Sequence, residues 1–143
     1  MNIQEILYNV HLKSYYIAET KKKEIPELCQ IQTSPDNNDI LIMYLRSAKE
    51  RLLAYMRKRL ISVQWDEEAL HITSDRDNAQ EMGQSLDNAI TDYLTEEVLY
   101  RWLCDTYPKL ADKTAVEEKL DYVKTCIHSL APLVSRRATT MGI

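Results

Sequence analysis

The chain has 143 residues, of which 45% are hydrophobic and 28% are charged, and its formal net charge is -4. This balance is ordinary for one folded domain and argues against an intrinsically disordered chain, while the negative charge argues against a general nucleic-acid binder. With 2 glycines and 4 prolines, the chain has few of the residues that turn-rich β proteins need, so helices are favoured.

The N-terminal part of the chain predicts a short helix followed by a loop. Over residues 2–12 apolar side chains recur at helical spacing, whereas residues 11–18 are compatible with either a helix or an extended chain. A lysine run, Pro26 and the polar stretch after Pro35 then predict a loop that reaches residue 38. The residues that define the short helix are Ile3, Ile6, Leu7 and Val10.

The strongest helical pattern begins at Asn38 or Asp39, and either side-chain oxygen can cap the first backbone N–H groups. One apolar stripe follows, with a residue every three or four positions. Its members are Leu41, Leu45, Ala48, Leu52, Tyr55, Met56 and Leu60. The opposite face is basic and holds one acid, Glu50. Its cations are Arg46, Lys49, Arg51, Arg57, Lys58 and Arg59.

Residues 61–73 predict a short β-hairpin, because apolar and polar residues alternate on both sides of a polar turn. A hairpin this short is not stable alone, so it must lean on helices or on a neighbouring subunit. The alternating apolar residues are Ile61, Val63 and Trp65 before the turn, and Leu70 and Ile72 after it.

Two further helices are predicted after the hairpin. The first covers residues 79–106 and ends before Pro108, which cannot continue a helix. The second opens with a capping box formed by Thr114 and Glu117, and Pro132 stops it. The apolar faces are Met82, Leu86, Ile90, Tyr93, Leu94, Val98 and Trp102 in the first, and Val116, Leu120, Val123, Ile127 and Leu130 in the second.

These elements together predict a mainly α fold. We expect a small bundle of three to four helices, with the hairpin between the second and third helices, in one domain over residues 1–133. An extended C-terminal tail is expected over residues 134–143. No apolar run in the sequence approaches the roughly 20 residues that span a bilayer, so no membrane contact is expected.

Enzyme motifs are absent from the sequence, which has no Gly-rich phosphate loop, no GxSxG elbow and no HExxH pair. The three histidines lie on different predicted elements, and the three cysteines form no CxxC pair. We therefore expect no catalytic site, no metal and no cofactor. An enzyme that uses Cys104 or His128 stays open as a minor alternative, although a helical cysteine is more often a small buried apolar residue.

The basic face of the second predicted helix has three interpretations. The ordinary one is a solvated surface. A second is a contact with an acidic face of a like subunit, which would close a head-to-tail ring. A third is a channel wall that faces nucleic acid. The acids of the third predicted helix that suit the second interpretation are Asp87, Asp92, Glu96, Glu97 and Asp105.

The chain also has nine tyrosines and no phenylalanine, more tyrosines than one small core can hide. Some of them either lie at the edge of the core with the hydroxyl in water, or remain available to an interface, where aromatic residues are enriched. Those concerned are Tyr8, Tyr15, Tyr16, Tyr44, Tyr93 and Tyr100.

The order of these elements resembles that of the head–tail connector, or adaptor, proteins of tailed bacteriophages and prophages, of the type found in Bacteroidetes. A short N-terminal helix precedes a long helix that opens with Asn38-Asp39-Ile40-Leu41, then a hairpin and two more helices. The other stretches that carry the resemblance are 15–18 (YYIA), 86–94 (LDNAITDYL), 98–103 (VLYRWL) and the basic exit 132–137.

The resemblance implies a structural subunit that forms a homo-oligomeric ring, commonly a dodecamer, between portal and tail in the neck of the virion. The particle is assembled in the host cytoplasm, and DNA passes through the ring without sequence recognition. The basic face would be Arg46, Lys49, Arg57, Lys58 and Arg59. The tail residues that grip a neighbouring ring would be Val134, Arg136, Arg137 and Met141, and the hairpin residues that contact a neighbour would be Trp65, Asp66, Glu67 and Glu68.

Besides the enzyme alternative, two other functions remain open at this stage. The chain could be a tail-completion or tail-terminator protein of the same particle, because the sequence does not separate these positions from a connector. It could also belong to another class, as a cytosolic helical module that binds proteins.

Overall fold

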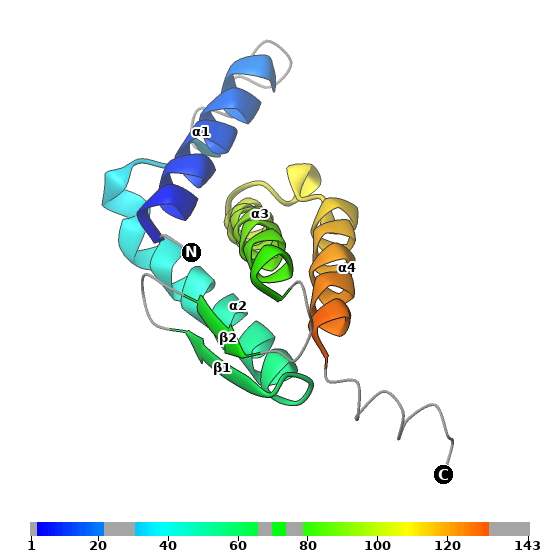
Figure 1. Cartoon of the computed structure of the whole chain (residues 1–143). Helices are drawn as coiled ribbons and strands as arrows, with labels where there is room; N and C mark the ends of the chain where they lie inside the picture. The colour runs from blue at the N-terminus through cyan, green and yellow to red at the C-terminus, as the bar shows by residue number, and fades with distance from the viewer. Residues whose placement is uncertain (1–2, 22–30, 66–69, 74–78, 132–143) are drawn as a thin grey trace.

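The computed structural model of the chain describes residues 3–21, 31–65, 70–73 and 79–131, and it is mainly helical with one small β-hairpin (Figure 1). The hairpin lies between the second and third helices, so the predicted fold class is confirmed. The predicted tail over residues 134–143 lies outside the described residues. The elements are α1 (Ile3–Lys21), η2 (Pro35–Asn37), α2 (Asn38–Arg57), β1 (Ser62–Trp65), β2 (Leu70–Thr73), α3 (Ala79–Thr106), η3 (Pro108–Leu110) and α4 (Lys113–Leu130).

Helix α3 is the centre of the fold, and it contacts α1, α2, α4 and β2. In Figure 1 α4 lies along one side of α3, while α2 and α1 lie on the other side. Four α3 residues at helical spacing are completely buried: Leu86, Ile90, Leu94 and Val98. The buried face is wider than this one row, because Ala89, Tyr93, Leu99, Trp102 and Leu103 are buried too, as expected of a helix packed among others.

Helix α1 is longer than the sequence predicts, because it continues through the ambiguous residues to Lys21. It buries Ile6, Leu7 and Val10 in the core, and then Ser14 and Ala18. The indole N–H of Trp102 in α3 donates a 2.6 Å hydrogen bond to the backbone carbonyl of Ile31, which fixes the chain beyond α1 against α3.

Helix α2 begins at Asn38 as predicted, but its first turn is not capped as predicted. The residue at the N-cap position is Asn37, and its side chain makes no capping hydrogen bond. The side-chain oxygen of Asn38 lies 2.9 Å from Nε2 of His11 in α1 instead, so it joins two helices rather than capping one. The buried stripe of α2 consists of Leu41, Leu45, Ala48, Leu52 and Met56, five members of the predicted stripe.

The hairpin is antiparallel, with Ser62 opposite Thr73 and Trp65 opposite Leu70. It packs on α2 and α3, as a two-stranded sheet must to be stable. The contact is made by Trp65, which is buried in the core, while the Lys49 ammonium of α2 lies 5.1 Å from the centre of its ring.

Helix α4 follows the short η3 turn and packs along α3. The predicted capping box of Thr114 and Glu117 is wrong. The N-cap is Asp112, whose carboxylate accepts hydrogen bonds from the backbone N–H groups of Thr114 and Ala115 at 3.0 and 3.3 Å. An aspartate upstream satisfies the first turn better because its charge also suits the positive end of the helix dipole. The stripe of α4 buries Val116, Val123, Ile127 and Leu130.

Candidate functional site

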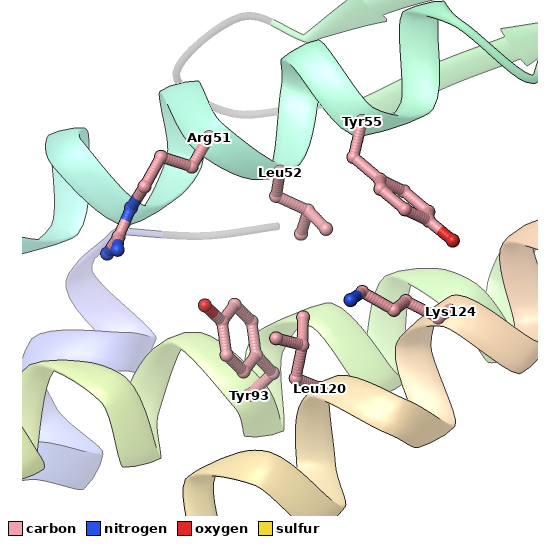
Figure 2. Close-up of a pocket in the computed structure, with 6 residues that line it drawn as sticks. All are labelled: Arg51, Leu52, Tyr55, Tyr93, Leu120 and Lys124. Carbon is pink, nitrogen blue, oxygen red and sulfur yellow. The ribbon is translucent and has the colours of Figure 1, made fainter.

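A pocket of about 200 Å³ lies where α2, α3 and α4 meet (Figure 2). Helix α2 contributes Arg51, Leu52 and Tyr55, and Tyr55 lies one turn after each of the other two. Helix α3 contributes Tyr93, and α4 contributes Leu120 and Lys124. The lining therefore combines two leucines and two aromatic rings with two cations.

A buried carboxylate, that of Glu97, forms an ion pair with Arg51, one of the two cations that line the pocket. Glu97 of α3 is only 5% exposed, and its Oε1 lies 3.0 Å from Nη2 of Arg51 and 3.3 Å from Nε of Arg101. A buried carboxylate needs such partners, because an unpaired one would be strongly destabilising. Burial raises the pKa of the neighbouring Tyr93 hydroxyl, and the charge of Glu97 raises it further. The Tyr93 hydroxyl therefore stays protonated near neutral pH.

Tyr55 is surrounded by cationic and polar groups. The Arg59 guanidinium lies 3.6 Å from the centre of its ring, and the Lys124 ammonium lies 5.2 Å from it. Both distances fall within the range of a cation–π contact. The Tyr55 hydroxyl lies 2.9 Å from Nε2 of His128, and the two rings meet edge to face at 79°. The four groups join α2 to α4 on one side of the pocket.

This arrangement is suited to holding an anion with an apolar body. Four cations converge here against one carboxylate, Glu97, in a protein whose net charge is negative. The pocket lining itself contains neither a nucleophilic serine or cysteine nor a carboxylate. Within the described parts of the chain, no three His, Cys, Asp or Glu side chains gather as a metal site would require.

The predicted basic face of α2 divides into two groups in the structure. Arg46, Arg57 and Lys58 are exposed. Lys49 and Arg59 are half-buried and lie over the rings of Trp65 and Tyr55. The first group is therefore the part of the predicted face that points freely into solvent.

Most of the acids of α3 that the sequence offers to a like subunit are engaged inside this chain. The Lys13 ammonium of α1 is paired with Glu96. Glu97 is buried with its two arginines, and the Tyr44 hydroxyl donates a hydrogen bond to Asp105. Asp92 stays exposed on the helix. The structure thus uses these charges to join α1 and α2 to α3.

Several residues singled out in the sequence lie either away from the pocket or outside the described residues. The hairpin residues Asp66, Glu67 and Glu68 lie outside the described residues, and so do the tail residues Val134, Arg136, Arg137 and Met141. Trp65 is packed in the core of this chain. The alternative catalytic residues Cys104 and His128 belong to α3 and α4, and only His128 lies near the pocket, through Tyr55.

His11 takes part in a polar network that the sequence does not predict. Its Nδ1 lies 2.6 Å from the Thr33 hydroxyl and its Nε2 lies 2.9 Å from the Asn38 side-chain oxygen. The Ser14 hydroxyl lies 3.1 Å from that of Thr33 and accepts a hydrogen bond from the Thr33 backbone N–H. This row of hydroxyl, imidazole and amide resembles a catalytic triad, but Thr33 is only 3% exposed and no substrate can reach it. The network joins α1 to the start of α2.

A second surface, the aromatic face of α1, consists of Tyr8, Leu12, Tyr15 and Tyr16. Leu12 lies one turn from each of the three tyrosines, and all four residues lie on the side of the helix opposite to its buried residues. They are 62%, 48%, 49% and 68% exposed, in chain order. The high tyrosine content of the sequence points to the three tyrosines of α1 but does not place them on one face. The periodicity of four residues from Tyr8 to Leu12 to Tyr16 is the signal that could have located it.

No family model, no curated protein and no solved structure matches this chain. Among the described helices, none is both long enough and apolar enough to cross a bilayer.

Proposed function

We propose that this chain is a structural subunit of the head–tail connector of a tailed bacteriophage, and that it acts by binding other protein chains. The observation that carries the proposal is the aromatic face of α1. Four large side chains are about half or more exposed there, while the inner side of the same helix already fills the core. An exposed aromatic surface of this kind is typical of a protein interface.

The order of the elements supports the connector assignment in particular. The chain places a helix, a long helix, a hairpin and two helices in the order that the resemblance requires. The exposed cations Arg46, Arg57 and Lys58 give α2 a surface suited to an acidic neighbour or to DNA passing through a ring. In this proposal the protein is assembled in the host cytoplasm and resides in the neck of the virion, between portal and tail.

Two other assignments use the same surfaces. A tail-completion or tail-terminator subunit would also assemble through the aromatic face, and would differ in the component that it binds. A cytosolic protein-binding module is favoured by a different observation, the pocket between α2, α3 and α4, which resembles a receptor for one side chain more than a contact between rings.

The assembly of the purified chain tests the proposal. Sedimentation velocity over a range of concentrations, alone and with the portal protein of a tailed bacteriophage, should show a large symmetric assembly. A variant with Tyr8→Ser, Leu12→Ser and Tyr16→Ser should sediment as a monomer, because it loses the apolar surface that joins subunits. Tyr122→Ser is the matched control, since it removes an exposed tyrosine from α4.

The triple variant should also keep its fold, because each side chain is largely exposed and surface substitutions change the free energy of unfolding by about 0.5 kcal/mol or less. Urea unfolding checks this. A wild-type chain that stays monomeric at every concentration, with and without portal, contradicts the proposal. Electron microscopy of the assembly distinguishes a ring on the portal from one on the tail.

A further inference from the structure

We propose that the pocket between α2, α3 and α4 binds the carboxylate of one acidic side chain, together with an adjacent apolar group, from a partner polypeptide. This inference does not depend on the connector assignment, because it rests on the pocket alone. It names the chemistry of a partner that the aromatic face of α1 does not specify.

The charge of the pocket selects an anion. The Lys124 ammonium points from α4 toward the space between Tyr55 and Tyr93 (Figure 2), and among the described residues no carboxylate forms an ion pair with it. The guanidinium of Arg51 uses one nitrogen for Glu97, and the Arg51 side chain is still 55% exposed. An entering carboxylate thus meets two cations, and the one buried carboxylate nearby is already paired with Arg51 and Arg101.

The hydroxyl of Tyr93 adds a hydrogen-bond donor. It is oriented toward Arg51 at the edge of the pocket, and within the described part of the chain no group is hydrogen-bonded to it. A donor in a largely buried position gains more from an anionic acceptor than one in water does. The carboxylate oxygens would therefore lie between Lys124 and the Tyr93 hydroxyl.

The apolar lining and the size of the pocket select the rest of the ligand. Leu52, Leu120 and the Tyr55 ring form the apolar part of the lining. An inorganic phosphate or a nucleic-acid backbone would leave this apolar surface without an apolar group to contact. The volume of about 200 Å³ is below the roughly 300–1,000 Å³ of sites for cofactors and drug-sized molecules. It suits one acidic side chain beside a leucine or a similar residue, which is the scale on which protein partners insert anchors.

Methyl NMR of Leu52 and Leu120 provides the test. The probe is the peptide acetyl-Leu-Glu-Leu-amide, and its control is the same peptide with Gln in place of Glu. We expect the acidic peptide to shift both methyl signals and to bind about tenfold more tightly than the neutral one, which corresponds to one charge-assisted contact. Equal binding of the two peptides would overturn the proposal.

Two variants locate the contact. Lys124→Met keeps the length of the side chain and should weaken the acidic peptide about tenfold, while Lys124→Arg should restore most of the binding. Lys119→Met is the matched control, because Lys119 is an exposed lysine on the same helix. Binding that is unchanged by Lys124→Met contradicts the proposal, and so does binding that Lys119→Met weakens equally.

Two further probes separate the possible sources of the anion. Hexanoate carries the same carboxylate on a small apolar body, and it should bind more weakly than the peptide because it lacks the flanking contacts. If hexanoate binds at least as tightly, the site serves a small carboxylic acid and the peptide assignment is wrong. If a single-stranded oligonucleotide displaces the peptide from the Leu52 and Leu120 methyl groups, the cations serve nucleic acid instead.

Discussion

Helices α1 and α4 are nearly equal in length and both pack against α3, yet the residues on their outer faces differ in polarity. Helix α4 is apolar on the inside and mainly polar on the outside, with Tyr122 as the exception. Helix α1 is apolar on both sides, because it buries Ile6 and Val10 and also carries the aromatic face. The outer side of α1 contributes nothing to the core, so its composition requires an explanation outside the folding of one chain.

The inner sides of the two helices differ as well. Helix α4 packs through a buried apolar stripe and has its polar contact, Tyr55 with His128, near the surface. Helix α1 is held partly by the more buried network of His11, Ser14, Thr33 and Asn38. A buried polar network stabilises the fold only while every member has a partner. The attachment of α1 is therefore more sensitive to the loss of one hydroxyl group than the attachment of α4 is.

The largest expected effect is in the core of α3, the helix against which both α1 and α4 pack. Leu94 of α3 is completely buried, so Leu94→Ala should lower the free energy of unfolding by about 2–5 kcal/mol through lost burial and the cavity left behind. Urea unfolding followed by circular dichroism measures it. Tyr122→Ala on the outer side of α4 is the control and should change stability by no more than about 0.5 kcal/mol. Similar losses in both variants would mean that α3 is not the centre of the fold.

A smaller effect is expected at the polar attachment of α1. Thr33→Val keeps the shape of the side chain but removes the hydroxyl that contacts His11 and Ser14, so it should cost about 1–3 kcal/mol. The same substitution at Thr20, which is exposed on α1, should be nearly neutral. Hydrogen exchange of the α1 amides checks the location, because the loss should accelerate exchange in α1 more than in α4. Equal acceleration in the two helices would argue against a separate attachment.

The smallest expected effect appears in alkali, at the contact between α2 and α3. Burial raises the pKa of Tyr44 from the ordinary 10.0 to about 12, and its hydrogen bond to Asp105 raises it too. Because the pKa is raised on folding, the neutral hydroxyl stabilises the folded chain. That contribution is complete below about pH 10 and is lost as the pH rises through about 12.

A Tyr44→Phe variant should accordingly lose less stability than the wild type between about pH 10 and 12, because it has no hydroxyl to ionise. Urea midpoints at several pH values in this interval measure the difference. Tyr8→Phe, which alters an exposed tyrosine of α1, should follow the wild-type curve. Parallel curves for Tyr44→Phe and the wild type would contradict the stabilising role of the Tyr44 hydroxyl and its contact with Asp105.

The elements could be predicted where one face of a helix or strand is buried and a residue that cannot continue the element, such as proline, marks its end. Helix α3 ends before Pro108 as predicted, and the hairpin follows from strict alternation. The second half of α1 could not be predicted, because Tyr15, Tyr16, Ile17 and Ala18 place apolar residues on every side and remove the periodicity. The caps of α2 and α4 were predicted wrongly because residue type does not reveal that Asn38 is bonded to His11 across the fold.

The pocket could not be predicted because its residues are far apart in the sequence. Sequence periodicity alone predicts that Arg51 and Lys124 are solvated charges and that Tyr93 belongs to a buried apolar stripe. Only packing brings them around one space. The same holds for Glu97, which the sequence assigned to an outer acidic face and which the fold buries between two arginines.

The hydrogen bond from Trp102 to Ile31 has an optical consequence. The chain has two tryptophans, so Trp65→Phe would leave a single indole whose environment depends on whether the segment after α1 is docked on α3. Emission from that indole would shift to longer wavelength when water replaces the carbonyl and its surroundings. The bonded pair is 71 residues apart in the sequence, and closing so long a loop is slow compared with pairing the adjacent helices α3 and α4. The same signal would therefore report when Ile31 docks on α3 during refolding.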